Sequence, residues 1–273
     1  MLNKTLKIFF NIIILLLCGH CVFSQTVAPP DEKNRPDDKS KSTDSSIKFE
    51  LNYLSNNVFM GRTDSVTTPT IVPEIKYTLK SGIYFSGSLY YLPNQKNNKL
   101  DGGGLTAGYD MDITDDLSAG ASYSRQFFSA SSAEITSSVR NAFDISFDYD
   151  LGDLLSPSLS ANYNINKQGV ANEFYATLDI SHDFLKKGIF TGKDLLLISP
   201  TITANTGANN SGAYAVLNYE LSTPFIYKAG HFIFQFAPTY SIPESRLPSD
   251  VIAIKPTHKS AVFYFETGVS VKF

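Results

Sequence analysis

The chain contains 273 residues, of which 42% are hydrophobic and 18% are charged, and its mean hydropathy is −0.09. These values are too polar for a bundle of membrane helices, and an aromatic content of 13% is too high for a disordered chain. The 20 Phe and 15 Tyr residues favour a β-rich fold, because both residue types are enriched in strands.

The first 24 residues are predicted to be a secretory signal peptide. Two lysines precede an apolar run at residues 8–18, and small residues offer a cleavage site before Gln25. The run is about half as long as the ~20 residues of a membrane-spanning helix, which disfavours the alternative of a membrane anchor. Cys18 and Cys21 both lie in this segment, so we expect no disulfide in the mature chain and, without a small residue before either cysteine, no lipid attachment.

The mature chain is expected to begin with a polar segment and to be acidic. Residues 25–46 alternate charged residues with Pro and Ser and have few apolar side chains, so we expect a disordered periplasmic spacer there. A short cell-wall-binding segment is the alternative. Loss of two lysines with the signal peptide reduces 23 basic residues to 21, against 26 acidic ones, a net charge of −5. This charge argues against a nucleic-acid partner.

From residue 47 to the last residue, apolar and polar side chains alternate with a period of two. In Ile83–Leu92, for example, Phe85 and Leu89 share one face, and Ser86 and Ser88 share the other. Strands produce this alternation because successive side chains point to opposite faces, whereas helical spacing would scatter it. The segment 47–273 is therefore predicted to be one β domain.

Twelve segments carry the alternation, an even number, and no helix-length periodic segment is left over. They cover residues 47–60, 69–80, 82–92, 104–114, 117–128, 138–150, 156–166, 171–184, 195–205, 213–224, 231–241 and 260–273. Their lengths suit the ~10 residues with which a tilted strand crosses a bilayer.

The connections between these segments alternate in length. Those after the second, fourth, sixth and tenth segments are tight, whereas those after the first, third, fifth and eleventh are long and polar. Tight turns on one side and long loops on the other are typical of an up-and-down transmembrane barrel. The join at residues 184–194 is longer than this pattern predicts, so a short helix or a bulge is expected there.

The last segment resembles the C-terminal signal of bacterial outer-membrane β-barrel proteins. Apolar residues alternate in FYFETGVSVKF, residues 263–273, and the chain ends in Phe. The matching positions are Phe265, Val269, Val271 and Phe273, whereas Thr267 departs mildly. The resemblance implies a closed barrel of about 12 strands in the outer membrane of a Gram-negative bacterium. Its implied partners are outer-membrane lipid and, during insertion, the barrel-assembly machinery.

Closure is required because an unpaired sheet edge in hydrocarbon costs several kcal/mol for each backbone group. The alternative is a soluble β-sandwich or a lipocalin-like barrel, in which the apolar faces would point inward. Aromatic residues near strand ends on the apolar face match an interfacial girdle, and they are Tyr53, Tyr77, Tyr91, Tyr109, Phe127, Tyr149 and Tyr163.

The inward face of the predicted barrel is rich in acidic residues. By strand parity the inward acidic residues are Glu50, Glu74, Asp110, Asp112, Asp144, Asp148, Asp150, Asp179, Asp183, Glu220 and Glu266. The inward basic residues are Lys48, Lys76, Arg140 and Lys272. Carboxylates around a water-filled lumen favour cations, so we expect a passive, narrow pore for small polar or cationic solutes, with Asp112, Asp148, Asp150 and Asp183 near its periplasmic mouth. The alternative is that these carboxylates only bond to polar neighbours, as in any barrel of this kind.

Two other functions stay open on the sequence alone. A non-conducting barrel that binds a ligand or partner through its outer loops is suggested by Ile252 and Ile254 in the last loop. A lipid hydrolase is suggested by His258 beside Ser260, and Asn56–Asp64 is similar to the N-terminal region of outer-membrane lipid A deacylases but lacks the rest of that motif. No metal-ligand spacing, catalytic triad or phosphate-binding loop stands out, so no catalytic residue, metal or cofactor is expected.

Overall fold

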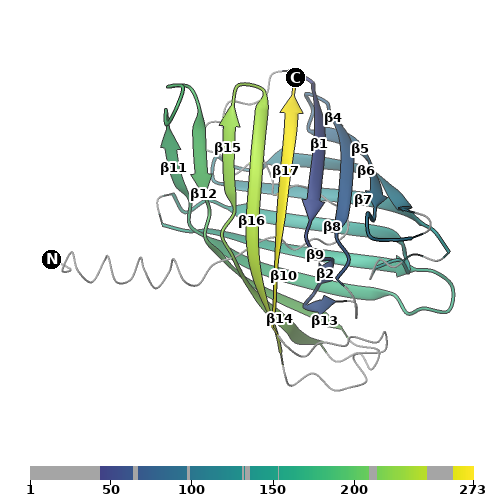
Figure 1. Ribbon diagram of the computed structural model, residues 1–273. Coiled ribbons are helices and arrows are strands. Elements are labelled where there is room, and N and C mark those ends of the chain that lie inside the picture. Colours follow the sequence, from purple (N-terminus) through teal and green to yellow (C-terminus); the bar gives the residue numbers. More distant parts are fainter. Residues whose placement is uncertain are drawn as a thin grey trace.

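The structure is a computed structural model that describes residues 44–63, 67–96, 99–130, 132, 136–152, 154–208, 214–244 and 261–273. The predicted signal peptide, and the predicted spacer as far as residue 43, lie outside the described residues. All regular elements in the described residues are strands (Figure 1). None of the described residues forms a helix long and apolar enough to cross a membrane.

The strand bounds agree closely with the predicted segments. The strands are β1 (Ser46–Leu54), β2 (Val58–Phe59), β3 (Arg62–Thr63), β4 (Thr70–Thr78), β5 (Ile83–Tyr91), β6 (Leu100–Asp112), β7 (Leu117–Phe128), β8 (Val139–Tyr149), β9 (Ser156–Asn166), β10 (Glu173–Ser181), β11 (Phe184–Lys187), β12 (Leu195–Ile198), β13 (Thr201–Ala208), β14 (Tyr214–Ser222), β15 (Phe225–Ala229), β16 (Phe232–Pro243) and β17 (Val262–Lys272).

Fifteen of these strands form one antiparallel sheet that closes on itself, because β17 pairs with β16 on one side and with β1 on the other. Three strands that cross the whole barrel are each divided into two shorter strands by one break. The two parts are β10 and β11, β12 and β13, and β14 and β15, and both parts of each strand pair with the same neighbouring spanning strands. The result is the predicted closed barrel of twelve spanning strands. The remaining two strands, β2 and β3, form a separate hairpin.

Prolines account for two of the three interruptions. Pro200 separates β12 from β13, and Pro224 separates β14 from β15; a proline has no N–H to donate to the ladder. The carbonyl groups of both prolines still accept hydrogen bonds: Pro200 O accepts from the N–H of His182 at 3.0 Å, and Pro224 O accepts from the N–H of Ser199 at 3.0 Å. The wall therefore stays closed across the breaks.

The two ends of the barrel differ as the connection lengths predict. We call the end where β1 begins and β17 ends the turn end, because the connections there are short; it is uppermost in Figure 1. The opposite end, the loop end, carries the long connections. At the turn end, a left-handed Gly82 (φ 91°) closes the β4–β5 turn, and its N–H donates to Leu79 O at 2.9 Å.

The expected helix or bulge at residues 184–194 is instead a strand, β11, followed by a turn outside the barrel wall. The buried Asp194 carboxylate organises this turn: it accepts hydrogen bonds from the N–H groups of Phe190 (2.8 Å) and Thr191 (3.1 Å) and from the Tyr227 hydroxyl (2.9 Å). Burial opposes ionisation of the carboxyl, but these donors outweigh it and lower the pKa of Asp194 to about 2.

Side chains are sorted in the opposite sense to that of a water-soluble barrel. On the outward face, Phe85 and Phe147 are 52% and 46% exposed, whereas the inward Asn52 and Glu50 are 0% and 7% exposed. Apolar surface in water costs roughly 25 cal/mol per Å², so a continuous outward belt of such residues requires apolar surroundings. This sorting contradicts the alternative of a soluble barrel with an apolar interior.

Candidate functional site

The lumen has two halves that differ in packing. In the half nearer the loop end, which we call the loop half, inward polar side chains such as Thr203, Asn205 and Asn218 are fully buried. In the turn half, small inward residues such as Ser118 and Gly120 are only partly buried. The loop half is therefore filled by side chains, and the turn half is more open beside β7.

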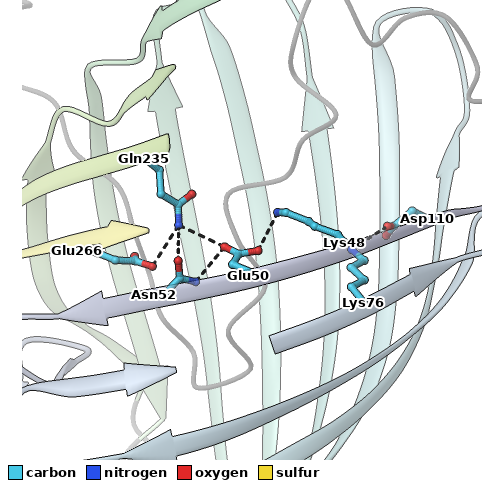
Figure 2. A network of polar contacts seen from close by, with 7 residues as sticks. All are labelled: Lys48, Glu50, Asn52, Lys76, Asp110, Gln235 and Glu266. Carbon is cyan, nitrogen blue, oxygen red and sulfur yellow. Dashed lines mark hydrogen bonds and ion pairs between the residues drawn. The ribbon is translucent and has the colours of Figure 1, made fainter. Parts of the chain in front are cut away.

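A polar network crosses the seam where the barrel closes (Figure 2). The Glu50 carboxylate of β1 pairs with Lys48 Nζ at 2.8 Å and accepts a hydrogen bond from Asn52 Nδ2 at 2.9 Å. The amide of Gln235, on β16, donates to Asn52 Oδ1 at 2.9 Å, to Glu50 at 3.3 Å and to Glu266, on β17, at 3.5 Å. Three of the predicted inward residues, Lys48, Glu50 and Glu266, are thus brought together, and Gln235 links their two strands to β16.

Gly268 makes this network possible. It lies on β17 directly between its register partners, Asn52 on β1 and Gln235 on β16. A Cβ at this position would collide with Asn52 Oδ1 and lie 2.8 Å from Gln235 Nε2. The absence of a side chain therefore allows two amides on non-adjacent strands to hydrogen-bond above the strand between them.

A second charged contact lies beside the seam. Lys76 of β4 is 4.0 Å from Asp110 of β6, and its ammonium group lies 3.9 Å from the centre of the Tyr84 ring. Figure 2 shows the Lys76–Asp110 contact next to the seam network. Glu74 is buried next to Glu50, its register partner on β1. Lysines therefore offset part of the carboxylate charge on this wall.

The other predicted acidic residues are distributed over several strands. Asp144 accepts hydrogen bonds from Asn162 (2.6 Å) and Ser122 (3.4 Å), and Glu220 accepts from Asn218 (2.8 Å) and the Tyr264 hydroxyl (3.3 Å). Asp148 is buried, Asp179 is half-buried, and Asp112 is exposed at the turn end of β6. Asp150 directly follows β8 at the turn end, and Asp183 lies at the break between β10 and β11.

Basic residues are more numerous on the inner face than the sequence predicted. Leu195 is buried and pairs in register with both Lys187 and Lys228, so all three side chains point to the same face. This face is the inner one, because it also carries the buried cluster that contains Ile226 and Ile233. Lys272 pairs in register with Lys48 at the turn end, and Arg140 lies half-buried at a bulge in β8. The turn half therefore carries lysines on one side and, on β6, β8 and β10, carboxylates on the other.

The first loop-end connection folds back against the inner wall, which the sequence did not predict. The first predicted strand, 47–60, ends at Leu54, and β2 and β3 form a hairpin with its turn at Met60 and Gly61. Phe59 and Met60 are 1% and 4% exposed and pack with Tyr175 of β10 and Leu217 of β14. The Phe59 and Tyr175 rings meet edge to face at 5.2 Å.

Two local features of the wall receive this hairpin. The first is a bulge at Leu217 of β14: Asn218 pairs with Asn205 and Val216 pairs with Thr206, which leaves Leu217 without a register partner on β13. The bulge turns the Leu217 side chain toward the hairpin. Gly61 has a left-handed φ of 72°, and a Cβ there would lie 2.7 Å from Asn218 Cβ. Only glycine allows the hairpin to approach this wall so closely.

Arg62 fixes the hairpin to β10. Its guanidinium donates to the Tyr175 hydroxyl at 2.7 Å and lies 3.5 Å from the Glu173 carboxylate. It also lies 5.1 Å from the centre of the Phe59 ring and 5.7 Å from that of Tyr175. We call these contacts the Arg62 latch.

The opposite wall of the loop half is also filled. Leu54, Val72, Tyr90 and Leu92 form a buried apolar cluster, with Phe128 packed against it. The Tyr90 hydroxyl donates to the Gln126 amide at 3.0 Å, and β9 presents a row of buried amides, Asn162, Asn164 and Asn166. Amide and aromatic side chains, rather than charges, therefore line most of the loop half.

The described histidines do not form a catalytic group. The imidazoles of His182 and His231 each bond to a backbone carbonyl at the turn end, Leu154 O and Lys272 O, both at 2.7 Å. Asn56 accepts a hydrogen bond from the N–H of Thr68 at 3.0 Å. His258, Asp64, Ile252 and Ile254 lie outside the described residues. Within the described ranges, no group of three or more His, Cys, Asp or Glu residues could hold a metal ion.

The residues of the predicted C-terminal signal lie on β17 and at its end. Phe265, Val269 and Val271 alternate with inward residues, and Val269 and Val271 pair in register with the outward Leu51 and Phe49 of β1. Phe273 is 67% exposed, and its N–H donates to Ile47 O at 2.9 Å. The C-terminal residue is thus part of the ladder that closes the barrel.

The barrel is similar to solved outer-membrane porins. A KdgM porin matches 84% of this chain and 99% of its own, with 12% identity and a TM-score of 0.52. A KdgM porin in complex with disordered oligogalacturonate matches with the same coverage and identity and a TM-score of 0.50. A NanC porin matches 83% of this chain and 100% of its own, with 10% identity and a TM-score of 0.48. No protein family and no curated protein matches the sequence. The likeness establishes a porin-like barrel fold.

Proposed function

We propose that the chain forms a narrow, passive pore for small polar or cationic solutes in the bacterial outer membrane. The observation that carries the proposal is the sorting of side chains around a closed cylinder, with an apolar outward face and a largely polar inward face. Such a cylinder is compatible with hydrocarbon outside and water inside, and a polar lumen offers solutes a path.

The lengths of the connections support an orientation. Outer-membrane barrels have short turns on the periplasmic side and longer loops outside. We therefore place the turn end in the periplasm and the loop end outside the cell. In this orientation the partly open, charged turn half faces the periplasm, and the β2–β3 hairpin narrows the outer part of the lumen.

The charge of the inner face supports a preference for cations. With Asp150 and Asp183 at the turn end, the carboxylates on β6, β8 and β10 outnumber the lysines that face the turn half, and Lys48 already pairs with Glu50. A negative lumen raises the local concentration of cations and lowers that of anions. The same charge disfavours a polyanion such as the oligogalacturonate bound by the similar KdgM porin.

Solute entry into proteoliposomes tests the proposal. Glucosamine, glucose and glucuronate are of similar size but carry positive, neutral and negative charge, so swelling rates compare charge at nearly constant size. We expect glucosamine to enter fastest and glucuronate slowest. Swelling with none of the three by a folded barrel would favour the non-conducting, partner-binding alternative, and fastest entry of glucuronate would overturn the cation preference.

A further inference from the structure

One charged side chain lies on the outward face near the loop end. Among the described strand residues whose register places them on that face, two are charged: Arg125 on β7 and Lys186 on β11. Arg125 is exposed and lies between two outward register partners, Leu105 of β6 and Asn141 of β8. An arginine among lipid-facing residues requires a partner of opposite charge or a position outside the hydrocarbon.

The depth of Arg125 follows from the aromatic residues beside it. Tyr123, Phe143, Tyr163 and Phe174 are consecutive register partners across β7, β8, β9 and β10, so they form one outward row around the barrel. Such rows lie at the interface between hydrocarbon and lipid headgroups. Arg125 is two residues closer to the loop end than Tyr123, about 6–7 Å further along the strand, at the level of the headgroups.

The guanidinium is held in place by its neighbours on the wall. Arg125 Nη1 donates to Asn141 Oδ1 at 2.9 Å, and the Tyr123 hydroxyl donates to the same oxygen at 2.7 Å. The guanidinium carbon lies 5.7 Å from the centre of the Phe127 ring. Within the described ranges no carboxylate pairs with Arg125. A cation is thus ordered at headgroup depth, and its positive charge has no counter-charge from those residues.

We infer that Arg125, supported by Asn141 and Tyr123, binds the phosphate group of an outer-leaflet lipid. A guanidinium matches a phosphate because its planar N–H groups can donate to two oxygens at once. Leu105 is exposed beside Arg125, and the outward Tyr123 and Phe143 lie one step closer to the membrane centre, where they can contact acyl chains. The surface therefore favours a lipid over free phosphate. This inference rests on the proposed outer-membrane location and orientation, and is independent of conduction.

Lipid retention by the purified full-length barrel tests the inference. Native mass spectrometry in detergent would compare bound lipid A with the same lipid after removal of its phosphates. Arg125→Gln should reduce retention of lipid A about tenfold, the effect of losing one hydrogen bond to a charged group. Lys186→Gln is the matched control, because it removes an outward positive charge near the turn end; retention should be unchanged.

Three outcomes would overturn the site. They are equal retention by Arg125→Gln and the unsubstituted protein, equal loss in Arg125→Gln and Lys186→Gln, and equal retention of the dephosphorylated lipid. Displacement of lipid A by millimolar inorganic phosphate would instead indicate a free-phosphate site. The gel shift on boiling reports whether each variant is folded, and an unchanged conductance of Arg125→Gln separates this site from the proposed pore.

Discussion

The same strands line both halves of the lumen, yet the two halves are built differently. In the loop half, amides, tyrosines and apolar side chains pack against one another and against the β2–β3 hairpin. In the turn half, β7 contributes small residues such as Ser118 and Gly120, and lysines and carboxylates remain partly exposed. The width of the lumen is therefore set mainly by an inserted loop, the β2–β3 hairpin, whereas its charge is set by the strands of the wall.

Removing the β2–β3 hairpin should change the conductance more than any other substitution proposed here. Replacement of Val58–Thr63 by a Gly/Ser linker takes Phe59 and Met60 out of the loop half, so single-channel conductance should rise at least about twofold. Planar-bilayer recording measures the change. A Gly/Ser replacement of Pro93–Lys96, also at the loop end, is the control and should leave the conductance unchanged. An unchanged conductance after hairpin replacement would show that the turn half, not the loop half, limits flow.

Gly268→Ala should destabilise the seam network, which lies near the middle of β17, between the loop half and the turn half. The added methyl group would collide with Asn52 and crowd Gln235, and such overpacking typically costs about 1–3 kcal/mol. The temperature of the gel shift between folded and unfolded barrel measures the loss. Gly87→Ala is the matched control on the outward face, where the new Cβ would meet Leu105 Cδ2 at an ordinary 3.5 Å. Equal shift temperatures for the two variants would contradict the role assigned to the seam network.

Weakening the Arg62 latch should let the β2–β3 hairpin leave the wall more often, while the hairpin itself stays in the chain. Arg62→Gln loses the ion pair with Glu173 and a charged hydrogen bond to Tyr175. Brief high-conductance openings should become about tenfold more frequent, as expected for the loss of one hydrogen bond to a charged group. The exchanged pair, Arg62→Glu with Glu173→Arg, should restore part of the closed state. No restoration, together with unchanged openings in Arg62→Gln, would show that apolar packing alone holds the hairpin.

The smallest effect is expected on the stability of the β11–β12 turn, which lies outside the lumen and is not expected to affect the pore. The pKa of Asp194 is about 2 in the folded barrel and 3.8 in an unperturbed Asp, so its carboxylate stabilises the turn above pH about 4. This stabilisation is lost as the pH falls through about 2. Pepsin cleavage near Phe190 should therefore accelerate toward pH 2 more strongly in the unsubstituted protein than in Asp194→Asn. The same pH dependence in both proteins would exclude the carboxylate as the cause.

The wall of the barrel was predictable because each strand position has one of two environments. Phe85 and Ser86 reveal their faces by composition alone, and this parity holds along the strands except at bulges such as the one in β14. Pro224 limited the prediction, because the predicted segment 213–224 ends at it and leaves out the inward Lys228. The predicted segment 171–184 ends just before the inward Lys187, at the break between β10 and β11. The alternation in this part of the chain continues across the breaks, although single segments do not show it.

The hairpin was not predictable by the same reasoning. Val58 and Phe59 extend the apolar alternation of the first strand, so the sequence favours one strand over 47–60. Ser55, Asn56, Asn57 and Gly61 are local signs of turns, but the alternation on either side favours a continuous strand. The residue that holds Arg62, Tyr175, is 113 positions away in sequence, and no local pattern connects the two. Contacts between a loop and a distant wall depend on the closed barrel, which only the three-dimensional structure supplies.

A recording of single-channel current from the unsubstituted barrel in a KCl gradient tests whether the lumen conducts and prefers cations. We expect discrete current steps that reverse at a potential of the sign expected for cations, because a largely polar, acid-rich lumen runs between the two ends of a closed cylinder. Correctly folded barrels that show no steps, or steps that reverse at a potential of the sign expected for anions, would contradict it.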